Sequence, residues 1–449
     1  MSSLVYAAAV QPQILQIRLS PKGIKPVRNG HPWIYNNAIV GAPESARVPE
    51  ASVRRLTGGD ALNWEHQQPA LVCDPSGRPL GWGTYNRRSR LAVRMLTTDI
   101  DAPWDRAACA AVVADAVARR GALLADAGTT ACRLVFGEGD GLPGLVADRY
   151  GDLVSVQYSA AFAWDNRETI EAALLAALGE HGVEARLLRT WDERMRDREG
   201  ISGVPAGKAG GGGAADGTGA PDDATSGAVT VSEGGLPWLV RPGAGQKTGL
   251  FCDQRDNRRR VAAWSSGRRV LDAFSYHGGF GLTALAAGAR EVCCIDSSAD
   301  AVEMIGRNAA AQESAAAGAL SAVRGDVFAM LHGEGVPGGI ASWDLIVLDP
   351  PKLVPGRRHL EAGLRSYKDL NRLVMRDMHP GALLATFSCS GAVSREDFRR
   401  MLAWAAVDAG RTVRILETFG QPSDHPVPLA FPEAEYLKGY LLQVSGSPR

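Results

Sequence analysis

Long apolar runs are missing from this sequence of 449 residues: no stretch approaches the roughly 20 residues that a membrane-spanning helix needs. Paired metal-binding cysteines are also missing, because the seven cysteines are scattered and none has C-x-x-C spacing. No net charge remains either, since 49 Lys and Arg balance 49 Asp and Glu. These absences predict a protein of the reduced cytoplasm, with no metal centre and no membrane partner.

The length is too great for one ordinary domain, and three are expected. Residues 1–13 are small and apolar without a basic leader, and predict a disordered extension. Residues 203–227 consist mostly of Gly, Ala, Asp, Ser and Thr, which cannot bury enough apolar surface to fold. The expected domains span residues 14–98, 99–244 (containing this mobile insertion) and 245–449.

Residues 14–98 carry twelve Lys and Arg against five Asp and Glu, an excess of seven positive charges. Short alternating runs broken by Gly and Pro predict a small β-barrel, with Gly23 to Trp33 as a basic turn. Basic residues such as Arg28 lie near Trp33 and Tyr35, and this combination is typical of RNA binding. A solvated basic face and core aromatics would give the same pattern.

Residues 99–244 mix helical and alternating patterns. Ala107–Ala125 and Asn166–His181 have apolar residues at helical spacing, and Leu145–Tyr158 predicts a hairpin through Tyr150-Gly151-Asp152. We therefore expect a small α+β domain here.

From Gly245 onward, apolar strands alternate with helical segments, which predicts a doubly wound, Rossmann-like parallel sheet. A final strand at Tyr436–Val444 is expected to pair antiparallel at the edge. The expected parallel strands are Arg269–Phe274, Glu291–Asp296, Ser321–Arg324, Leu345–Asp349, Leu383–Ser388 and Thr412–Phe419.

The first of these strands leads into a glycine-rich turn, DAFSYHGGFG, that does not match the G-x-G-x-x-G fingerprint of dinucleotide binding. An acid before the glycines would repel a pyrophosphate but could accept from an ammonium group, which favours S-adenosylmethionine over NAD. Acids at the ends of three successive strands would face one crevice. The residues predicted to bind this cofactor are Asp272, Phe274, Gly278, Gly279, Asp296 and Asp326.

Two further strand ends carry reactive groups. Asp349, Pro350, Pro351 and Lys352 follow the strand LIVL, and Cys389 follows ALLATFS. A thiolate that adds to C6 of cytosine makes C5 nucleophilic, and a carboxyl group on N3 and the amino group would stabilise the charge that develops. We therefore expect Cys389 and Asp349 to be catalytic, and Pro350, Pro351, Lys352 and Arg28 to bind substrate. For Cys389 the alternative is a small buried residue.

The motifs DAFSYHGGFG, DPPK, SYKDLN and FSCSG, preceded by GQKTGLFCDQRDNR, resemble the RlmI-type methyltransferases of large-subunit ribosomal RNA. The resemblance covers nearly the whole chain. It implies a PUA domain, a small α+β domain and a class I methyltransferase domain that makes 5-methylcytosine, and it suggests a homodimer. It also implies that Cys389 is the nucleophile, that Asp349 contacts the base, and that Gln254 borders the pocket for S-adenosylmethionine.

The sequence departs from many RNA cytosine-5 methyltransferases at one point. These enzymes carry a second cysteine just after Asp-Pro-Pro that helps release the product, and here the residues are Lys352-Leu353-Val354. The base that removes the C5 proton is not identified. Two alternatives stay open: methylation of a guanine nitrogen in RNA, and a non-catalytic RNA-binding assembly factor.

Overall fold

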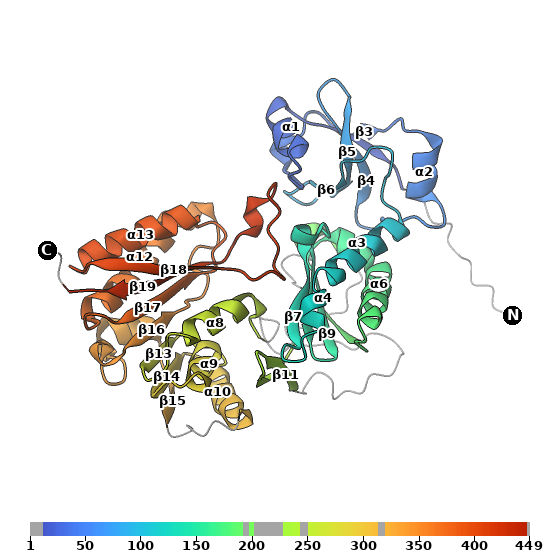
Figure 1. The fold of residues 1–449 in the computed structure, drawn as a ribbon. Helices are drawn as coiled ribbons and strands as arrows, with labels where there is room; N and C mark the ends of the chain where they lie inside the picture. The colour runs from blue at the N-terminus through green and yellow to red at the C-terminus, as the bar shows by residue number, and fades with distance from the viewer. Residues whose placement is uncertain (1–11, 192–196, 202–227, 243–249, 313–318, 447–449) are drawn as a thin grey trace.

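The computed structural model describes residues 12–191, 197–201, 228–242, 250–312 and 319–446. Sheets of six, four and seven strands follow one another along the chain, and each builds its own body (Figure 1). Among the described helices, none combines the length and the apolar character needed to cross a membrane. The expected N-terminal extension lies mostly outside the described residues, and the expected glycine-rich insertion lies wholly outside them.

The six-stranded sheet has the order β2-β6-β5-β4-β1-β3, and only its β1–β4 pair is parallel. Its apolar residues form two clusters, one with Ile17 and Val72 and the other with Leu71 and Trp82. The strands are β1 Leu15–Arg18, β2 Trp33–Ile34, β3 Glu44–Ser45, β4 Gln68–Cys73, β5 Pro79–Tyr85 and β6 Val93–Thr97. The helices are α1 Pro21–Arg28, η1 Asn36–Ala38 and α2 Glu50–Thr57.

The basic turn expected between Gly23 and Trp33 is wrong over most of its length, because residues 21–28 form α1. Gly23 and Pro26 suggested a turn, but Pro21 takes the first helical position, where its fixed φ suits a helix. Buried Val27 anchors the helix to the sheet. The basic side chains of this segment therefore project from a helix.

The second body is a four-stranded sheet with the order β10-β9-β8-β7, covered by α3 and α6. The expected hairpin is present, while the expected helix Ala107–Ala125 is divided after Ala118 into α3 and the short α4. The strands are β7 Ala131–Phe136, β8 Leu145–Tyr150, β9 Leu153–Tyr158 and β10 Arg186–Trp191. The helices are α3 Arg106–Ala118, α4 Gly121–Leu124, η2 Gly137–Asp140, α5 Ala161–Asp165 and α6 Arg167–Glu180.

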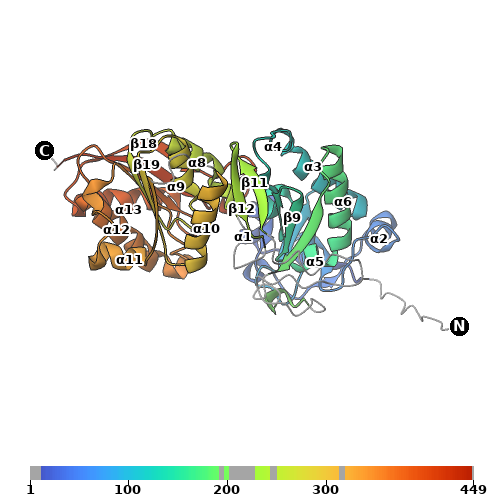
Figure 2. The ribbon, with the colours of Figure 1, turned by 90° about the horizontal axis from the view of Figure 1, so that it is seen from below.

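A separate hairpin of β11 (Val229–Glu233) and β12 (Leu236–Val240) lies between the second and third bodies (Figure 2). On one side, the Ser232 backbone exchanges hydrogen bonds with Thr130. On the other side, Glu233 accepts from the buried Arg258 guanidinium at 2.7 and 2.5 Å. The hairpin therefore ties the two bodies together.

The seven-stranded sheet has the order β15-β14-β13-β16-β17-β19-β18. The strands expected at Glu291–Asp296 and Leu383–Ser388 are confirmed to the residue. The last strand is antiparallel as expected, but its edge position is wrong: it lies between β17 and β18, so that β18 forms the edge. The strands are β13 Arg269–Ala273, β14 Glu291–Asp296, β15 Leu320–Arg324, β16 Leu345–Leu348, β17 Leu383–Ser388, β18 Val413–Gly420 and β19 Lys438–Val444.

Both faces of this sheet are covered, as its continuous apolar strands require. Alternate strand residues point to opposite faces: Leu271 packs under α12 and α13, whereas Val270 packs under α8 and α9 (Figure 1). The longer helices are α8 Arg255–Ala262, α9 Gly279–Ala286, α10 Ala299–Ala311, α12 Leu360–Asp377 and α13 Arg395–Asp408. The short helices are η3 Cys252–Gln254, α11 Val327–Ala329, η5 Met330–Glu334, η6 Ile340–Ser342, η7 Arg357–His359 and η8 Pro432–Ala434.

Candidate active site

The turn after β13 is tightly bent. Phe274 and Tyr276 have positive φ angles of 65° and 50°, and Gly278 has one of 81°. Side chains other than glycine rarely adopt this region, and such strain concentrates at functional sites. The bend lets α9 begin at Gly279, directly beyond the carboxyl end of β13.

Asp272 lies at the base of this turn and is buried. Its Oδ2 accepts the Gly281 backbone N–H at 2.8 Å, whereas its buried Oδ1 has no hydrogen-bond partner among the described residues. Burial raises the pKa of Asp272 to about 7, and the nearby charges of Asp349 and Asp296 act in the same direction. A buried carboxylate oxygen without a donor is costly unless a ligand supplies one.

The glycines of the turn have different roles. Gly278 occupies a left-handed conformation that a side chain would strain. A Cβ on Gly279 would lie 3.0 Å from Cδ of Arg258, and one on Gly281 would collide with Sγ of Cys294. The last glycine thus permits close packing of α9 on β14.

The other two acids follow the neighbouring strands. Asp296, half-buried at the end of β14, accepts the backbone N–H groups of Tyr276 and Ser298, both at 2.9 Å. Asp326 is exposed and caps α11 through Oδ1, which accepts from Phe328 and Ala329 at 2.8 and 3.2 Å. Asp296 is therefore hydrogen-bonded to the glycine turn itself, while Asp326 lies at its border.

Aromatic rings lie beside the glycine turn, and among them Phe274 was predicted to bind the cofactor. The Phe274 and Phe328 rings meet edge to face at 5.5 Å, and Tyr276 stacks on His277 at 3.7 Å and meets Phe251 at 5.1 Å. Tyr276 and Phe328 were missed as candidate ligand contacts, although each adjoins a residue that had been singled out.

The DPPK segment follows β16, which pairs with β13 and β17. Asp349 is half-buried, Pro350 is buried, and Pro351 and Lys352 are exposed. Nε2 of Gln254 donates to Oδ2 of Asp349 at 3.1 Å. Oε1 of Gln254 accepts from Asn257 at 2.6 Å, so both ends of the Gln254 amide are engaged within the protein. Gln254 was expected at the cofactor, which stays a prediction; in the structure its amide contacts Asp349.

Cys389 follows β17, is half-buried and is not in a disulfide. It stands between the buried residues Ser388 and Ser390, and both serines contact the buried Tyr367. The Tyr367 hydroxyl accepts from Oγ of Ser388 at 3.0 Å and lies 3.2 Å from Oγ of Ser390. The Ser390 hydroxyl also accepts the backbone N–H of Val354 at 3.2 Å. One network therefore connects the cysteine turn to the segment after Asp349.

A buried lysine lies behind this turn. Lys438 begins β19, pairs with Ser388 in the sheet, and donates to the carbonyls of Ser390 and Val393 at 2.8 and 2.5 Å. The sequence-based prediction of the site included neither Lys438 nor Tyr367. For Lys438, the sequence feature that could have indicated it is a lysine within an apolar strand. Cys252, Cys293 and Cys294 are buried, as expected of packing residues.

Arg28 lies in another body of the protein. Its side chain is 53% exposed and contacts Asp74 at 3.3 Å. The segment after it reaches the loop before β19: His31 lies 3.1 Å from Glu433, and the Trp33 ring meets the Phe431 ring at 4.6 Å. The segment after Arg28, rather than Arg28 itself, therefore contacts the loop that leads to Lys438.

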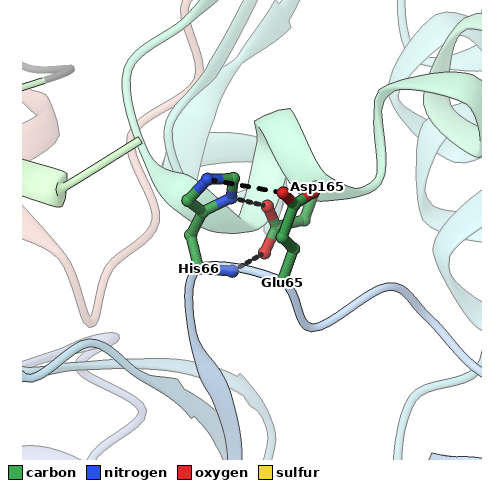
Figure 3. A group of neighbouring side chains, drawn as sticks. All are labelled: Glu65, His66 and Asp165. Atoms are coloured by element: carbon green, nitrogen blue, oxygen red, sulfur yellow. Dashed lines mark hydrogen bonds and ion pairs between the residues drawn. The ribbon is translucent and has the colours of Figure 1, made fainter. Parts of the chain in front are cut away.

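Glu65, His66 and Asp165 form the group with metal-ligand chemistry among the described residues (Figure 3). Both Asp165 oxygens are already engaged: Oδ1 lies 2.6 Å from His66 Nδ1, and Oδ2 accepts the His66 backbone N–H at 3.0 Å. His66 Nε2 lies 3.9 Å from the exposed Glu65 carboxylate. Hydrogen bonding between the first two bodies accounts for this arrangement without an ion.

Comparison with known proteins agrees with this arrangement of bodies. A PUA-like domain model matches residues 17–98, and an S-adenosylmethionine-dependent methyltransferase model matches residues 223–430. The ribosomal RNA large subunit methyltransferase I of Pseudoalteromonas atlantica is 34% identical over 96% of this chain and 99% of its own. That of Salmonella typhimurium is 32% identical over 96% and 98%.

The chain belongs to the ribosomal RNA large subunit methyltransferase I family. Among solved structures, a putative methyltransferase from Streptococcus mutans shares the fold, with a TM-score of 0.75 and 18% identity over 96% of this chain and 100% of that chain. A putative methyltransferase complexed with SAH has a TM-score of 0.74 at 17% identity over the same shares.

The residues present fit the cofactor of this methyltransferase family. S-adenosylmethionine carries an ammonium group, which is the donor that the buried Oδ1 of Asp272 lacks among the described residues. Asp296, at the end of the next strand, stands where an acid binds ribose hydroxyls in dinucleotide folds. The Phe274 and Phe328 rings offer apolar surface beside these acids.

Proposed function

We propose that this protein transfers a methyl group from S-adenosylmethionine to C5 of a cytosine in large-subunit ribosomal RNA. The observation that carries the proposal is that Cys389 and Asp349 directly follow the adjacent parallel strands β17 and β16, at the same edge of the sheet as Asp272 at the end of β13. The substrate is taken from the relatives, which are named as methyltransferases of large-subunit ribosomal RNA.

The protein's residues divide the chemistry as follows. The Cys389 thiolate adds to C6, and the electron pair of the C5–C6 double bond becomes available at C5. The Asp349 carboxyl group hydrogen-bonds N3 and the amino group and stabilises the charge that develops there. The cofactor supplies the methyl group that C5 accepts. Loss of the C5 proton to a base then restores the double bond and expels the thiolate, so atoms and electrons balance.

Two other functions remain as outcomes of the test. Methylation of a guanine nitrogen needs no thiol, because that nitrogen already has a lone pair, so the half-buried Cys389 favours cytosine-5 chemistry. A non-catalytic assembly factor would have no need of a buried carboxylate at a cofactor pocket. An adenine amino group is disfavoured because Lys352, rather than an aromatic residue, follows the two prolines.

Bisulfite sequencing of large-subunit ribosomal RNA, with and without the gene, tests the proposal. A cytosine that resists conversion in the parent and is converted in the deletion strain is the expected result. Complementation with the intact gene should restore resistance. Identical conversion in both strains would contradict cytosine-5 methylation, and loss of a methylated guanine from the same RNA, measured by mass spectrometry of its nucleosides, would support the second candidate.

Cofactor affinity should depend on pH through Asp272. Its pKa of about 7 means that the carboxyl group becomes protonated as the pH falls through this value, and a neutral carboxyl group cannot pair with the ammonium. The dissociation constant of S-adenosylhomocysteine should therefore rise by about one order of magnitude between pH 7 and pH 5.5. Calorimetry would measure it. The matched variant Asp272→Asn should bind weakly with little pH dependence; an equally steep dependence in this variant would assign the titration elsewhere.

The basic helix α1 should supply salt-dependent RNA affinity. Lys22, Lys25 and Arg28 are all exposed on it. Each phosphate contact contributes about 0.7 to 0.9 to the slope of log affinity against log salt, so replacing all three by glutamine should reduce the slope by about 2. Filter binding at several salt concentrations would measure this. Arg47→Gln with Arg54→Gln, near and on α2, is the control; an unchanged slope in the α1 variant would refute the assignment.

A further inference from the structure

Lys438 is a buried cation immediately behind the cysteine turn. It is 1% exposed, and β-sheet pairing sets it opposite Ser388, the residue before Cys389. Its ammonium donates to the carbonyl oxygens of Ser390 and Val393, the first and last residues of the turn that follows Cys389. Two of its three N–H groups are thereby used to fix the backbone next to the thiol.

Burying an ammonium is costly unless an anion or several dipoles compensate it. Among the described residues, no carboxylate forms an ion pair with Lys438. The nearest acid by electrostatic effect is Glu435, and Arg395 already binds its carboxylate at 2.8 Å. In the structure, two carbonyl dipoles therefore offset the cost of burying the Lys438 ammonium, and an anionic partner would offset it further.

The charged and titratable groups around Lys438 indicate which anion that is. Burial lowers the pKa of Lys438 to about 8, Glu435 and Cys389 oppose this effect, and Arg395 and Lys352 add to it. The Tyr367 hydroxyl, the other titratable group at the turn, is hydrogen-bonded to both serines, and burial raises its pKa. Cys389 is thus the group able to present a new negative charge to Lys438.

We propose that Lys438 is a positioning residue that fixes the turn carrying Cys389 and stabilises its thiolate. This rests on the proposed function only in taking Cys389 as the nucleophile. An opposite charge within about 4–6 Å typically lowers the pKa of an acid by 1–3 units, so such an ammonium would raise the thiolate fraction at neutral pH.

The same charge has a consequence for product release. The segment after Asp349 has no second cysteine to assist elimination. A stabilised thiolate is a better leaving group. When the C5 proton is lost, the C6–S electron pair returns to a sulfur on the turn that the Lys438 ammonium holds, and release can proceed without a second thiol.

The test compares Cys389 alkylation by iodoacetamide from pH 5 to pH 9.5 in the full-length protein and in Lys438→Met, which keeps an unbranched side chain of similar length but not the charge. Peptide mass spectrometry would quantify the modification of Cys389. In Lys438→Met, the pH midpoint of alkylation should rise by at least one unit, and the rate at pH 7 should fall about tenfold. Neither RNA nor methyl transfer is involved, so a failure of cytosine-5 chemistry would not alter the readout.

Lys368→Met is the matched control, because Lys368 is a partly exposed lysine on α12 that pairs with Asp408 at the end of α13. Its alkylation profile should match the parent protein. Lys438→Arg keeps the charge, so its alkylation midpoint should lie close to that of the parent protein. Binding of S-adenosylhomocysteine checks that each variant is folded. If Lys438→Met binds the cofactor and keeps the parental midpoint, the proposal is overturned. If Lys438→Met does not fold, the alkylation midpoint of Lys438→Arg is compared at low and at high salt. A higher midpoint at high salt, where charge effects weaken, supports the proposal, and an unchanged midpoint overturns it.

Discussion

Replacing Cys389 by alanine should abolish methylation of ribosomal RNA while leaving cofactor binding intact. In the proposed reaction the Cys389 thiolate makes C5 nucleophilic, and the other six described cysteines are all buried. Loss of a covalent nucleophile slows other enzymes by about 10⁴-fold or more. Single-turnover assays with ribosomal RNA fragments and labelled cofactor would measure the loss.

The control is Cys109→Ala, which removes a buried thiol from α3 in the second body and should retain full activity. RNA carrying 5-fluorocytidine adds a second readout. Fluorine at C5 cannot leave as a proton does, so the parent protein should form an adduct that survives denaturing electrophoresis, and Cys389→Ala should not. Methylation within tenfold of the parent rate in Cys389→Ala would rule out this residue as the nucleophile and favour a nitrogen acceptor.

The sequence was sufficient to predict the strand ends that carry the site. Buried parallel strands are continuous apolar runs, so LIVL and LLATFS could be recognised and the residues after them placed at one edge of the sheet. The strand order could not be obtained this way. Whether β19 inserts beside β17 or stays at the edge depends on pairing between segments far apart in the chain.

The residues that support the site were harder to predict. Lysine is rarely buried, so its place in an apolar strand was not enough to single out Lys438 as a supporting residue. Tyr367 lies in the helical motif SYKDLN, and nothing local shows that its hydroxyl reaches two serines 21 and 23 residues away. Gln254 was assigned to the cofactor because its segment borders the pocket, but only coordinates show its amide on Asp349.

The change Asp349→Asn should lower the turnover rate by about 10³-fold with little effect on the Michaelis constant for RNA. Asparagine can still donate to N3 and accept from the amino group, but it cannot transfer a proton to N3 as negative charge develops. A group that acts only in the transition state affects turnover rather than substrate binding. Gln254 would still hydrogen-bond the asparagine oxygen, so the side chain should keep its orientation.

Two variants sharpen this measurement. Asp349→Ala removes the hydrogen bonds as well and should also raise the Michaelis constant, which separates positioning from proton transfer. Asp344→Asn is the matched control: Asp344 precedes β16 at the opposite end of the same strand, where it accepts from the Arg269 backbone at 2.8 Å and contacts His379. It should leave turnover unchanged. Because Asp349 and Cys389 stand at the ends of paired strands, Asp349→Asn should still form the 5-fluorocytidine adduct, only more slowly; turnover within tenfold of the parent would show that Asp349 holds the base without supplying a proton.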